Sequence, residues 1–262
     1  MLNSKFSYSL LFFLLLLAHV AAGVYFNGYS PWWILWCILA YITLLVLASI
    51  KIQWNFYFKS LNLLPILKIT FEKGQLQLVQ NQKQIALTFD DGPAEQTEAV
   101  LDILKKENIK ATFFLIGKNI QGRETLVQRM FDEGHSIGNH SFNHGFNFDW
   151  QSASRMTDEL VQTNEAIENI TKQEVKLFRP PYGVTNPNLA KAVTNTGLKS
   201  IGWSLRSMDT IAKSESELLE KILKQVKARD IILLHDRCAV TAAILPDLIK
   251  ELKKRNYSFA SL

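Results

Sequence analysis

Short apolar runs alternate with longer amphipathic stretches from residue 85 to the end of this 262-residue chain. In the first long stretch, Glu95–Glu107, the side chains of Val100, Leu101 and Leu104 recur at helical spacing. Strands that are joined by helices pair in parallel, so the alternation predicts an α/β fold. The expected strands are Ile85–Phe89, Thr112–Ile116, Ser136–Asn139, Lys176–Arg179, Lys199–Trp203, Asp230–His235 and Ser258–Ala260.

Two architectures satisfy this alternation, an open doubly wound sheet and a closed or nearly closed barrel. An open sheet concentrates its site at one switch point, whereas a barrel collects ligands from many strand ends. Polar candidate residues follow five of the expected strands, and Asp91-Gly92-Pro93 after the first is a turn without a glycine-rich phosphate loop. We therefore predict a barrel. Its helices are expected at Glu95–Glu107, Asn119–Asp132, Ser152–Ile170, Asn188–Asn195 (with Gly197 as a stop), Glu215–Ala228 and Thr241–Lys254.

Two apolar segments precede the barrel region. Tyr8–Phe26 and Pro31–Ile50 contain no Asp, Glu, Lys or Arg, and both can cross a hydrocarbon core at about 20 residues per crossing. Only Asn27–Ser30 separates them, which predicts a hairpin of two transmembrane helices. A secretory signal peptide cleaved near Val20-Ala21-Ala22 is the alternative, but the apolar run continues through that point. The expected domains are a hairpin at 1–50, an interfacial linker at 51–79 and the barrel at 80–262.

The distribution of charge argues against a nucleic-acid partner. The first 71 residues carry four lysines and no acid, whereas the remaining 191 hold 25 basic and 24 acidic side chains. The turn between the apolar segments has no Lys or Arg, while Lys5, Lys51 and Lys59 lie on the outer flanks. This asymmetry predicts that both chain ends lie on the cytoplasmic face of a cell membrane. Trp54 and Phe56–Phe58 are expected to form an aromatic belt at that interface.

Residues that can bind a metal follow the first and third expected strands. Asp90 and Asp91 are adjacent carboxylates, which stay ionised together only if a cation or an arginine offsets them. His140 and His144 are four residues apart and would lie on one side of a helical turn. With one Asp oxygen they supply three protein ligands and leave positions open, as a catalytic zinc site requires. Asp-Asp-Gly-Pro is, by itself, also ordinary turn chemistry.

Further candidates follow the later strands. Arg179 could pair with a carboxylate and keep it ionised and oriented. Tyr182-Gly183 could present a backbone N–H to a developing oxyanion. His235 ends an apolar run and could act as a general acid, oriented either by Asp209 or by the adjacent Asp236.

Four motifs stand in a fixed order along the chain: Thr88-Phe89-Asp90-Asp91-Gly92, His140-Ser141-x-x-His144, Arg179-Pro180-Pro181-Tyr182 and Leu233-x-His235. Together they resemble the motifs of the polysaccharide deacetylase family, the NodB-homology or carbohydrate esterase 4 group. The resemblance covers roughly residues 80–262. It implies a distorted (β/α)7 barrel in which a divalent metal activates water against an acetyl group on a sugar.

The resemblance also implies a role for each motif residue. Asp90 would be the general base, Arg179 would orient it, and His235 would be the general acid. The backbone N–H of Tyr182 would help to bind the oxyanion, and Leu233 would line the pocket for the acetyl methyl group. The metal would be held by Asp91, His140 and His144. One divalent ion is therefore expected, zinc first, with cobalt, manganese and nickel as alternatives for this ligand set.

The chain departs from the family in its fourth motif, which usually resembles Asp-x-x-Asp-Trp. Here Trp203 leads into Arg206-Ser207-Met208-Asp209-Thr210. Asp209 retains the second acid, whereas Arg206 replaces the first and Thr210 replaces the tryptophan. Trp203 and Arg206 are the substrate contacts expected in this part of the site. An arginine at the rim favours an anionic substrate.

These features predict a membrane-anchored, metal-dependent hydrolase that removes acetyl groups, N-acetyl before O-acetyl, from a carbohydrate. The carbohydrate would be lipid-linked or part of the cell envelope, and membrane lipid is the other expected partner. Two alternatives are a deformylase or deacylase of a lipid-linked sugar and a non-catalytic glycan-binding barrel. If the charge asymmetry does not decide the topology, the barrel would lie outside the cytoplasm.

Overall fold

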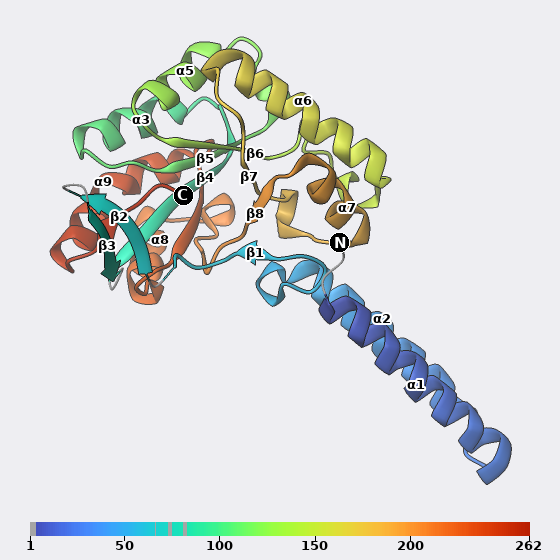
Figure 1. Cartoon of the computed structure of the whole chain (residues 1–262). Coiled ribbons are helices and arrows are strands. Elements are labelled where there is room, and N and C mark those ends of the chain that lie inside the picture. The colour runs from blue at the N-terminus through green and yellow to red at the C-terminus, as the bar shows by residue number, and fades with distance from the viewer. Residues whose placement is uncertain (1–3, 66, 73–74, 81–82) are drawn as a thin grey trace.

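The body of the protein is a curled parallel sheet with helices on its outer side (Figure 1). The structure is a computed structural model that describes residues 4–65, 67–72, 75–80 and 83–262. The strand order is β1-β8-β7-β6-β5-β4-β10-β9, with β11 paired to β4. The predicted α/β fold is confirmed, and every expected strand has a counterpart. The strands are β1 Ser60–Leu61, β4 Gln84–Gly92, β5 Thr112–Leu115, β6 Ser136–Asn139, β7 Leu177–Phe178, β8 Lys199–Ile201, β9 Leu205–Arg206, β10 Ile231–His235 and β11 Ser258–Phe259.

A broken strand gives the sheet the form of a distorted barrel. β8 and β9 are two halves of one extended stretch, which is interrupted at residues 202–204. β8 pairs with β7 and β1, whereas β9 pairs with β10 at the other end of the sheet. The sheet therefore curls almost back on itself, as the predicted distorted (β/α)7 barrel requires. The break also leaves the carbonyl oxygens of Ile201 and Gly202 free to accept hydrogen bonds from Arg179.

The central strand β4 determines where the two predicted carboxylates lie. β10 pairs with β4 in parallel, and His235 stands opposite Asp90. On the other side of β4, the register with β5 shifts between Asp90 and Gly92. Asp91 takes the extra position with a φ of 73°. This bulge turns two consecutive side chains toward one end of the barrel, whereas in a regular strand they would face opposite sides.

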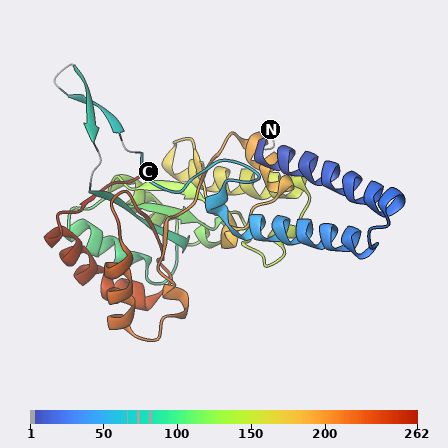
Figure 2. The same cartoon turned by 90° about the horizontal axis from the view of Figure 1, so that it is seen from below.

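Amphipathic helices cover the outer side of the sheet, as both cartoon views show (Figures 1 and 2). In α3, the predicted apolar stripe of Val100, Leu101 and Leu104 is fully buried. The helix expected at Asn119–Asp132 is divided near Gly122, whose φ is 78°. The helices are α3 Thr97–Lys106, α4 Gly117–Ile120, α5 Glu124–Asp132, α6 Ala153–Thr171, α7 Pro187–Thr196, α8 Glu215–Gln225 and α9 Ala239–Lys254.

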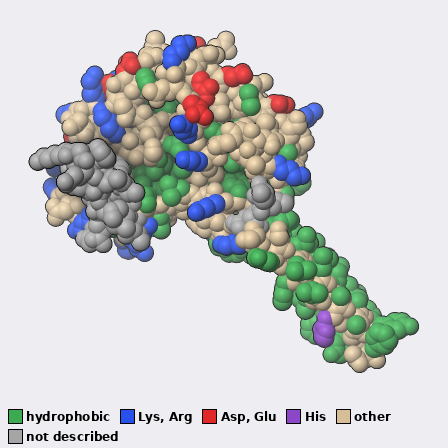
Figure 3. Space-filling model, in the orientation of Figure 1, with side chains coloured by type: hydrophobic (Ala, Val, Ile, Leu, Met, Phe, Trp, Pro, Cys, Tyr) green, Lys and Arg blue, Asp and Glu red, His purple; other side chains and the backbone are tan. Residues whose placement is uncertain are grey.

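The N-terminal segments form an antiparallel helical hairpin that projects from the body (Figure 1). Its helices are α1 Ser4–Asn27 and α2 Trp32–Ile50, with mean hydropathies of 2.2 and 2.4 in their most apolar windows. Most of their side chains are exposed, and Figure 3 shows a hydrophobic surface along the hairpin. By length and composition both helices could cross a membrane.

The residues that follow the hairpin belong to the barrel as much as to a linker. Phe56–Phe58 are buried in the main core, so the prediction that they form an aromatic belt is wrong, and Trp54 alone is largely exposed. Ile52 and Leu64 join a second apolar cluster beside Ile201. The aromatic residues are buried because the base of the hairpin packs on them, with the ring of Phe6 against that of Phe56.

The rest of the predicted linker contains an antiparallel pair of strands. β2 (Leu67–Glu72) and β3 (Gln75–Gln80) stand apart from the barrel sheet (Figure 2). Residues 66, 73 and 74 of the expected linker lie outside the described residues. The expected domain limits therefore stay a prediction.

Candidate active site and metal centre

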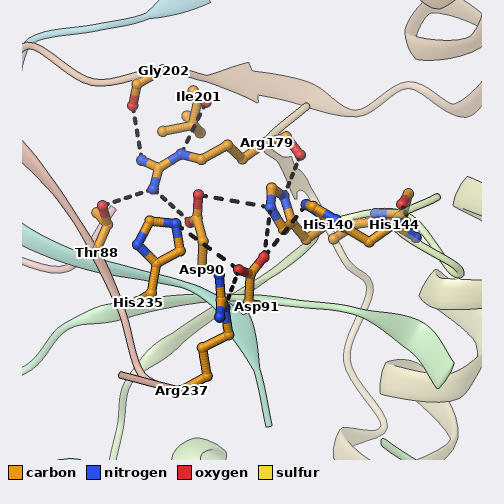
Figure 4. A network of polar contacts seen from close by, with 12 residues as sticks. Thr88, Asp90, Asp91, His140, His144, Arg179, Ile201, Gly202, His235 and Arg237 are labelled. Carbon is orange, nitrogen blue, oxygen red and sulfur yellow. Dashed lines mark hydrogen bonds and ion pairs between the residues drawn. The ribbon is translucent and has the colours of Figure 1, made fainter. Parts of the chain in front are cut away.

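The residues predicted from the four motifs meet at the carboxyl ends of the barrel strands (Figure 4). A cleft of about 430 Å³ opens there. The strands β4 and β10 bring Asp90, Asp91 and His235 together, and the other residues come from the segments after β6 and β7. The assembled side chains are those of Asp90, Asp91, His140, His144, Arg179 and His235.

One carboxylate oxygen and two imidazole nitrogens converge on a single point. Asp91 Oδ1 lies 3.5 Å from His140 Nε2 and 3.4 Å from His144 Nε2. Tetrahedral zinc with ligands at about 2.1 Å would space its ligand atoms by about 3.4 Å. Asp91 Oδ1 is buried and accepts no hydrogen bond among the described residues. These three residues therefore fit a divalent metal ion.

A backbone contact orients the imidazole of His140, and a tight loop carries His144 to the same point. His140 Nδ1–H donates to the carbonyl oxygen of Arg179 at 2.7 Å, which leaves Nε2 available as a ligand. Ser141 and His144 both have positive φ, so the segment is a tight loop and the expected helical turn is wrong. Asn139 holds this loop, because its Oδ1 accepts from the Ser141 N–H at 2.8 Å. The loop still brings both imidazoles to the same side.

Electrostatics at this trio favour an ionised carboxylate. Burial raises the pKa of Asp91, but the close approach of His140, with the imidazoles of His144 and His235, outweighs burial and holds the pKa far below its usual range. Burial and the neighbouring His140 lower the pKa of His144 to about 4, so its imidazole is neutral at neutral pH and can offer a ring nitrogen to a cation. For His140, Asp90 and Asp91 outweigh burial and raise the pKa. A bound cation would replace that proton.

Arg179 pairs with Asp90 and is completely buried. Its Nη1 donates to Asp90 Oδ1 and to Thr88 Oγ1, both at 2.8 Å. Nη2 and Nε donate to the carbonyl oxygens released by the break between β8 and β9. All its nitrogens are thus engaged, and the guanidinium stacks at 4.2 Å on the ring of Phe114. Asp90 is therefore held in one orientation, with its second oxygen turned toward the cleft side of His140 at 3.8 Å.

His235 is oriented by Asp209, which settles the choice left open between two carboxylates. His235 Nδ1–H donates to Asp209 Oδ1 at 2.8 Å, and its backbone N–H donates to Oδ2 at 2.7 Å. Thr241 also donates to Oδ2. Asp236 points away and accepts from Thr97 instead. Burial lowers the pKa of His235, but the hydrogen bond and charge of Asp209 outweigh burial and raise it.

Arg237 is a site residue that the sequence did not reveal. Its Nε donates to Asp91 Oδ2 at 2.7 Å, while the half-exposed guanidinium reaches the cleft rim. Oδ2 is thereby occupied and Oδ1 faces the two imidazoles. The available signal was its position, two residues after His235 on the turn that leaves β10.

The remaining predicted residues line the same cleft, around the carboxylates and histidines described above. Tyr182 has a φ of 57°, and its backbone N–H makes no backbone hydrogen bond among the described residues. Leu233 and Trp203 are nearly buried in the cleft wall, and Arg206 is exposed at its rim. Gly183 lies so close to the indole of Trp203 that an added Cβ would come within 2.2 Å of it. Position 183 therefore requires a glycine, because a side chain there would clash with the indole of Trp203.

Comparison with known proteins gives matches over the barrel. A family model described as polysaccharide deacetylase matches residues 78–201. The peptidoglycan-N-acetylmuramic acid deacetylase of Bacillus subtilis is 37% identical over 186 residues, covering 69% of this chain and 70% of that protein. The peptidoglycan-N-acetylglucosamine deacetylase of Listeria monocytogenes is 35% identical and covers 70% of this chain. The match spans only 39% of the Listeria protein's length.

A solved structure supports the same relationship. The crystal structure of a CE4 family pseudoenzyme from Bacillus anthracis superposes with a TM-score of 0.65 at 29% identity. The alignment covers 70% of this chain and 64% of that one.

Proposed function

Because this chain belongs to the polysaccharide deacetylase family, we propose that it is a metal-dependent hydrolase that removes acetyl groups from a carbohydrate. N-acetyl groups are the first candidate and O-acetyl groups the second. The single observation that carries the proposal is the convergence of Asp91 Oδ1 with the Nε2 atoms of His140 and His144. A base and an acid flank this convergence in fixed orientations.

Asp90 is the proposed general base. A divalent cation held by Asp91, His140 and His144 would supply Lewis-acid polarisation of the acetyl carbonyl and of the attacking water. Arg179 pairs with the Asp90 carboxylate and orients it in the cleft, so that it can take a proton from water.

His235 is the proposed general acid on the other side of the floor. Its Nε2 lies 4.0 Å from Asp91 Oδ2, and Asp209 holds its Nδ1. The protonated ring would deliver its Nε2 proton to the amine nitrogen as the acetyl group leaves. The free backbone N–H of Tyr182 would stabilise the oxyanion, and Leu233 would contact the acetyl methyl group.

We also propose that α1 and α2 anchor the enzyme in a membrane, with the barrel on the cytoplasmic face. Two apolar helices with exposed side chains support the anchor, and the lysines on their outer flanks support the orientation. The relatives from Bacillus subtilis and Listeria monocytogenes are named peptidoglycan deacetylases, which supports an acetylated cell-envelope polymer or its lipid-linked precursor as the substrate. A formylated lipid-linked sugar is the alternative substrate for the same proposed metal ligands, base and acid.

Metal content and acetate release test the proposal together. The full-length protein, purified in an uncharged detergent, should contain about one equivalent of divalent metal. It should release acetate from at least one member of a panel of acetylated glycans, and a chelator should stop the release. The double variant His140→Ala/His144→Ala should lose both metal and activity while retaining its circular dichroism spectrum. Full metal content in that folded variant would refute the site.

A non-catalytic glycan-binding barrel is the second candidate, because a CE4 pseudoenzyme is among the similar structures. In this chain the ligand trio, Asp90 with Arg179, and His235 with Asp209 are all present and mutually oriented. A binding module needs none of these pairs. Metal-loaded protein that binds glycans and releases no acetate from any of them would favour this candidate.

A further inference from the structure

The cleft is lined by more positively charged side chains than are needed to neutralise the two carboxylates at its base. Asp90 and Asp91 are the acidic residues that line it within the described part of the chain. Three cations line the same cleft: Lys118, Arg206 and Arg237. The acids already have partners below the rim, since a buried arginine holds Asp90 and two imidazoles face Asp91. Arg237 also pairs with Asp91 through Nε, so Lys118 and Arg206 are the rim cations that, among the described residues, carry charge beyond this balance and remain open to a ligand.

Each of the three cations has side-chain N–H groups that form no hydrogen bond with another described residue. Lys118 is exposed at the start of α4 and forms no ion pair among the described residues. Arg206 is exposed, and its guanidinium carbon lies 5.9 Å from the centre of the Trp203 ring. Arg237 uses only Nε for Asp91, so its two η nitrogens are not bonded within the described structure. A ligand in the cleft would meet at least two guanidinium groups.

We propose that the cleft accepts a carbohydrate with an anionic group, a carboxylate or a phosphate, close to the acetylated sugar, and that Arg206 binds this anion with Lys118 and Arg237. This inference rests on the proposed function and specifies its substrate class. Arginine presents a planar fork that matches both carboxylate and phosphate oxygens. The indole beneath Arg206 limits the orientations of that fork and so lowers the entropy lost on binding.

The structure also shows why Arg206 is the principal contact. β9 places it on the open side of the cleft, next to Thr210, while its chain neighbour Leu205 is buried. Lys118 and Arg237 come from two other segments, after β5 and β10. The three cations thus reach the cleft lining from three different segments, and a negatively charged chain in the cleft could contact more than one of them.

Matched substrates test the inference directly. Acetylated oligosaccharides of equal length would be compared in neutral, carboxylate-bearing and phosphate-bearing forms, using full-length, zinc-loaded protein in uncharged micelles. We expect kcat/KM to be at least about tenfold higher for one of the anionic forms, because hydrogen bonds to charged groups are strong. The preferred form distinguishes an acidic sugar from a phosphate. The preference should shrink as ionic strength rises, since the rim is exposed to solvent.

Arg206→Gln and Lys118→Gln identify the residues responsible. In Arg206→Gln the ratio of anionic to neutral kcat/KM should fall about tenfold, mainly through KM for the anionic substrate. Lys118→Gln should give a smaller fall. Lys191→Gln, at an exposed position of α7, removes a charge from outside the cleft lining and should leave the ratio unchanged. An unchanged ratio in Arg206→Gln would overturn the assignment.

A binding measurement separates this inference from the proposed function. Asp90→Asn should retain the rim and the metal ligands while turnover is lost, so affinity for intact substrates can be measured by calorimetry. Acetate release without any preference for anionic forms would overturn the inference and leave the deacetylase standing. If no acetate is released from any substrate, the deacetylase fails, and equal affinity for neutral and anionic forms would then overturn the anionic subsite as well.

Discussion

At the scale of single residues, the orientation of His235 depends on a carboxylate from the 3-10 turn that follows β9. Asp209 is buried and accepts four hydrogen bonds: two from His235, one from the Thr241 hydroxyl and one from the Thr210 backbone N–H. A carboxylate so engaged stabilises the imidazolium form, which raises the pKa of His235. His235, the proposed general acid, therefore keeps its proton to a higher pH than a free histidine would.

Asp209→Asn should shift the pH dependence of turnover. The acid must be protonated to act, and loss of the negative charge lowers the pKa of His235, so activity should disappear at a lower pH. The alkaline limb of the kcat–pH profile should move down, while the maximal kcat falls by roughly 10²-fold. Asp236→Asn is the matched control, because Asp236 contacts Thr97 and not the imidazole. If the control moved the limb and Asp209→Asn did not, the orienting role would belong to Asp236.

The sequence predicted which side chains lie together in the cleft, but it predicted their individual hydrogen-bond partners less well. The four motifs placed the proposed metal ligands, base and acid after strand ends, and strand geometry brings those ends together. It left Asp209 and Asp236 as alternatives, because the partner of a side chain depends on tertiary contacts. Arg237 was missed for the same reason, since its bond to Asp91 joins segments far apart in the chain.

At the scale of elements, β1 makes the segment after the hairpin part of the barrel. Its backbone pairs with β8, and Ser60 Oγ lies 2.8 Å from Ser200 Oγ in the interior. The carbonyl oxygen of Leu64 accepts from Arg229 Nε at 2.7 Å. Strands of two residues are too short to show a hydrophobic periodicity in the sequence. The break between β8 and β9 escaped prediction because it follows from which partner each half finds.

Two soluble fragments should therefore differ strongly in stability. A fragment of residues 72–262 lacks β1 and exposes the cavities left by Ile52, Leu64 and Phe58. Each lost apolar side chain costs about 1.5–3 kcal/mol, which together is a large share of a typical 5–15 kcal/mol. Fragment 51–262 retains these contacts. Urea unfolding should give the longer fragment a clearly higher midpoint, and equal midpoints would show that β1 adds nothing.

At the scale of the whole molecule, the hairpin and the cleft are mechanically connected. The Thr185 N–H donates to the carbonyl oxygen of Ser49 at 2.9 Å, three residues after the cleft residue Tyr182. Lys5 donates to the carbonyl oxygen of Trp54 at the same base. The loop at the edge of the cleft therefore rests on the end of α2. A hairpin that spans a membrane would keep the cleft near the lipid surface, where a membrane-associated glycan could reach it.

The last prediction concerns the side of the membrane on which the barrel lies. The turn between α1 and α2 has no Lys or Arg, whereas Lys5, Lys51 and Lys59 flank the hairpin, so both ends should be cytoplasmic. C-terminal fusions report the side: GFP should fluoresce and alkaline phosphatase should be inactive. Introducing Asn27→Lys and Ser30→Lys into the turn should weaken or reverse this result if charge decides the orientation. Active phosphatase with dark GFP in the wild type would place the barrel outside, and a wall or capsule polymer would then be the better substrate.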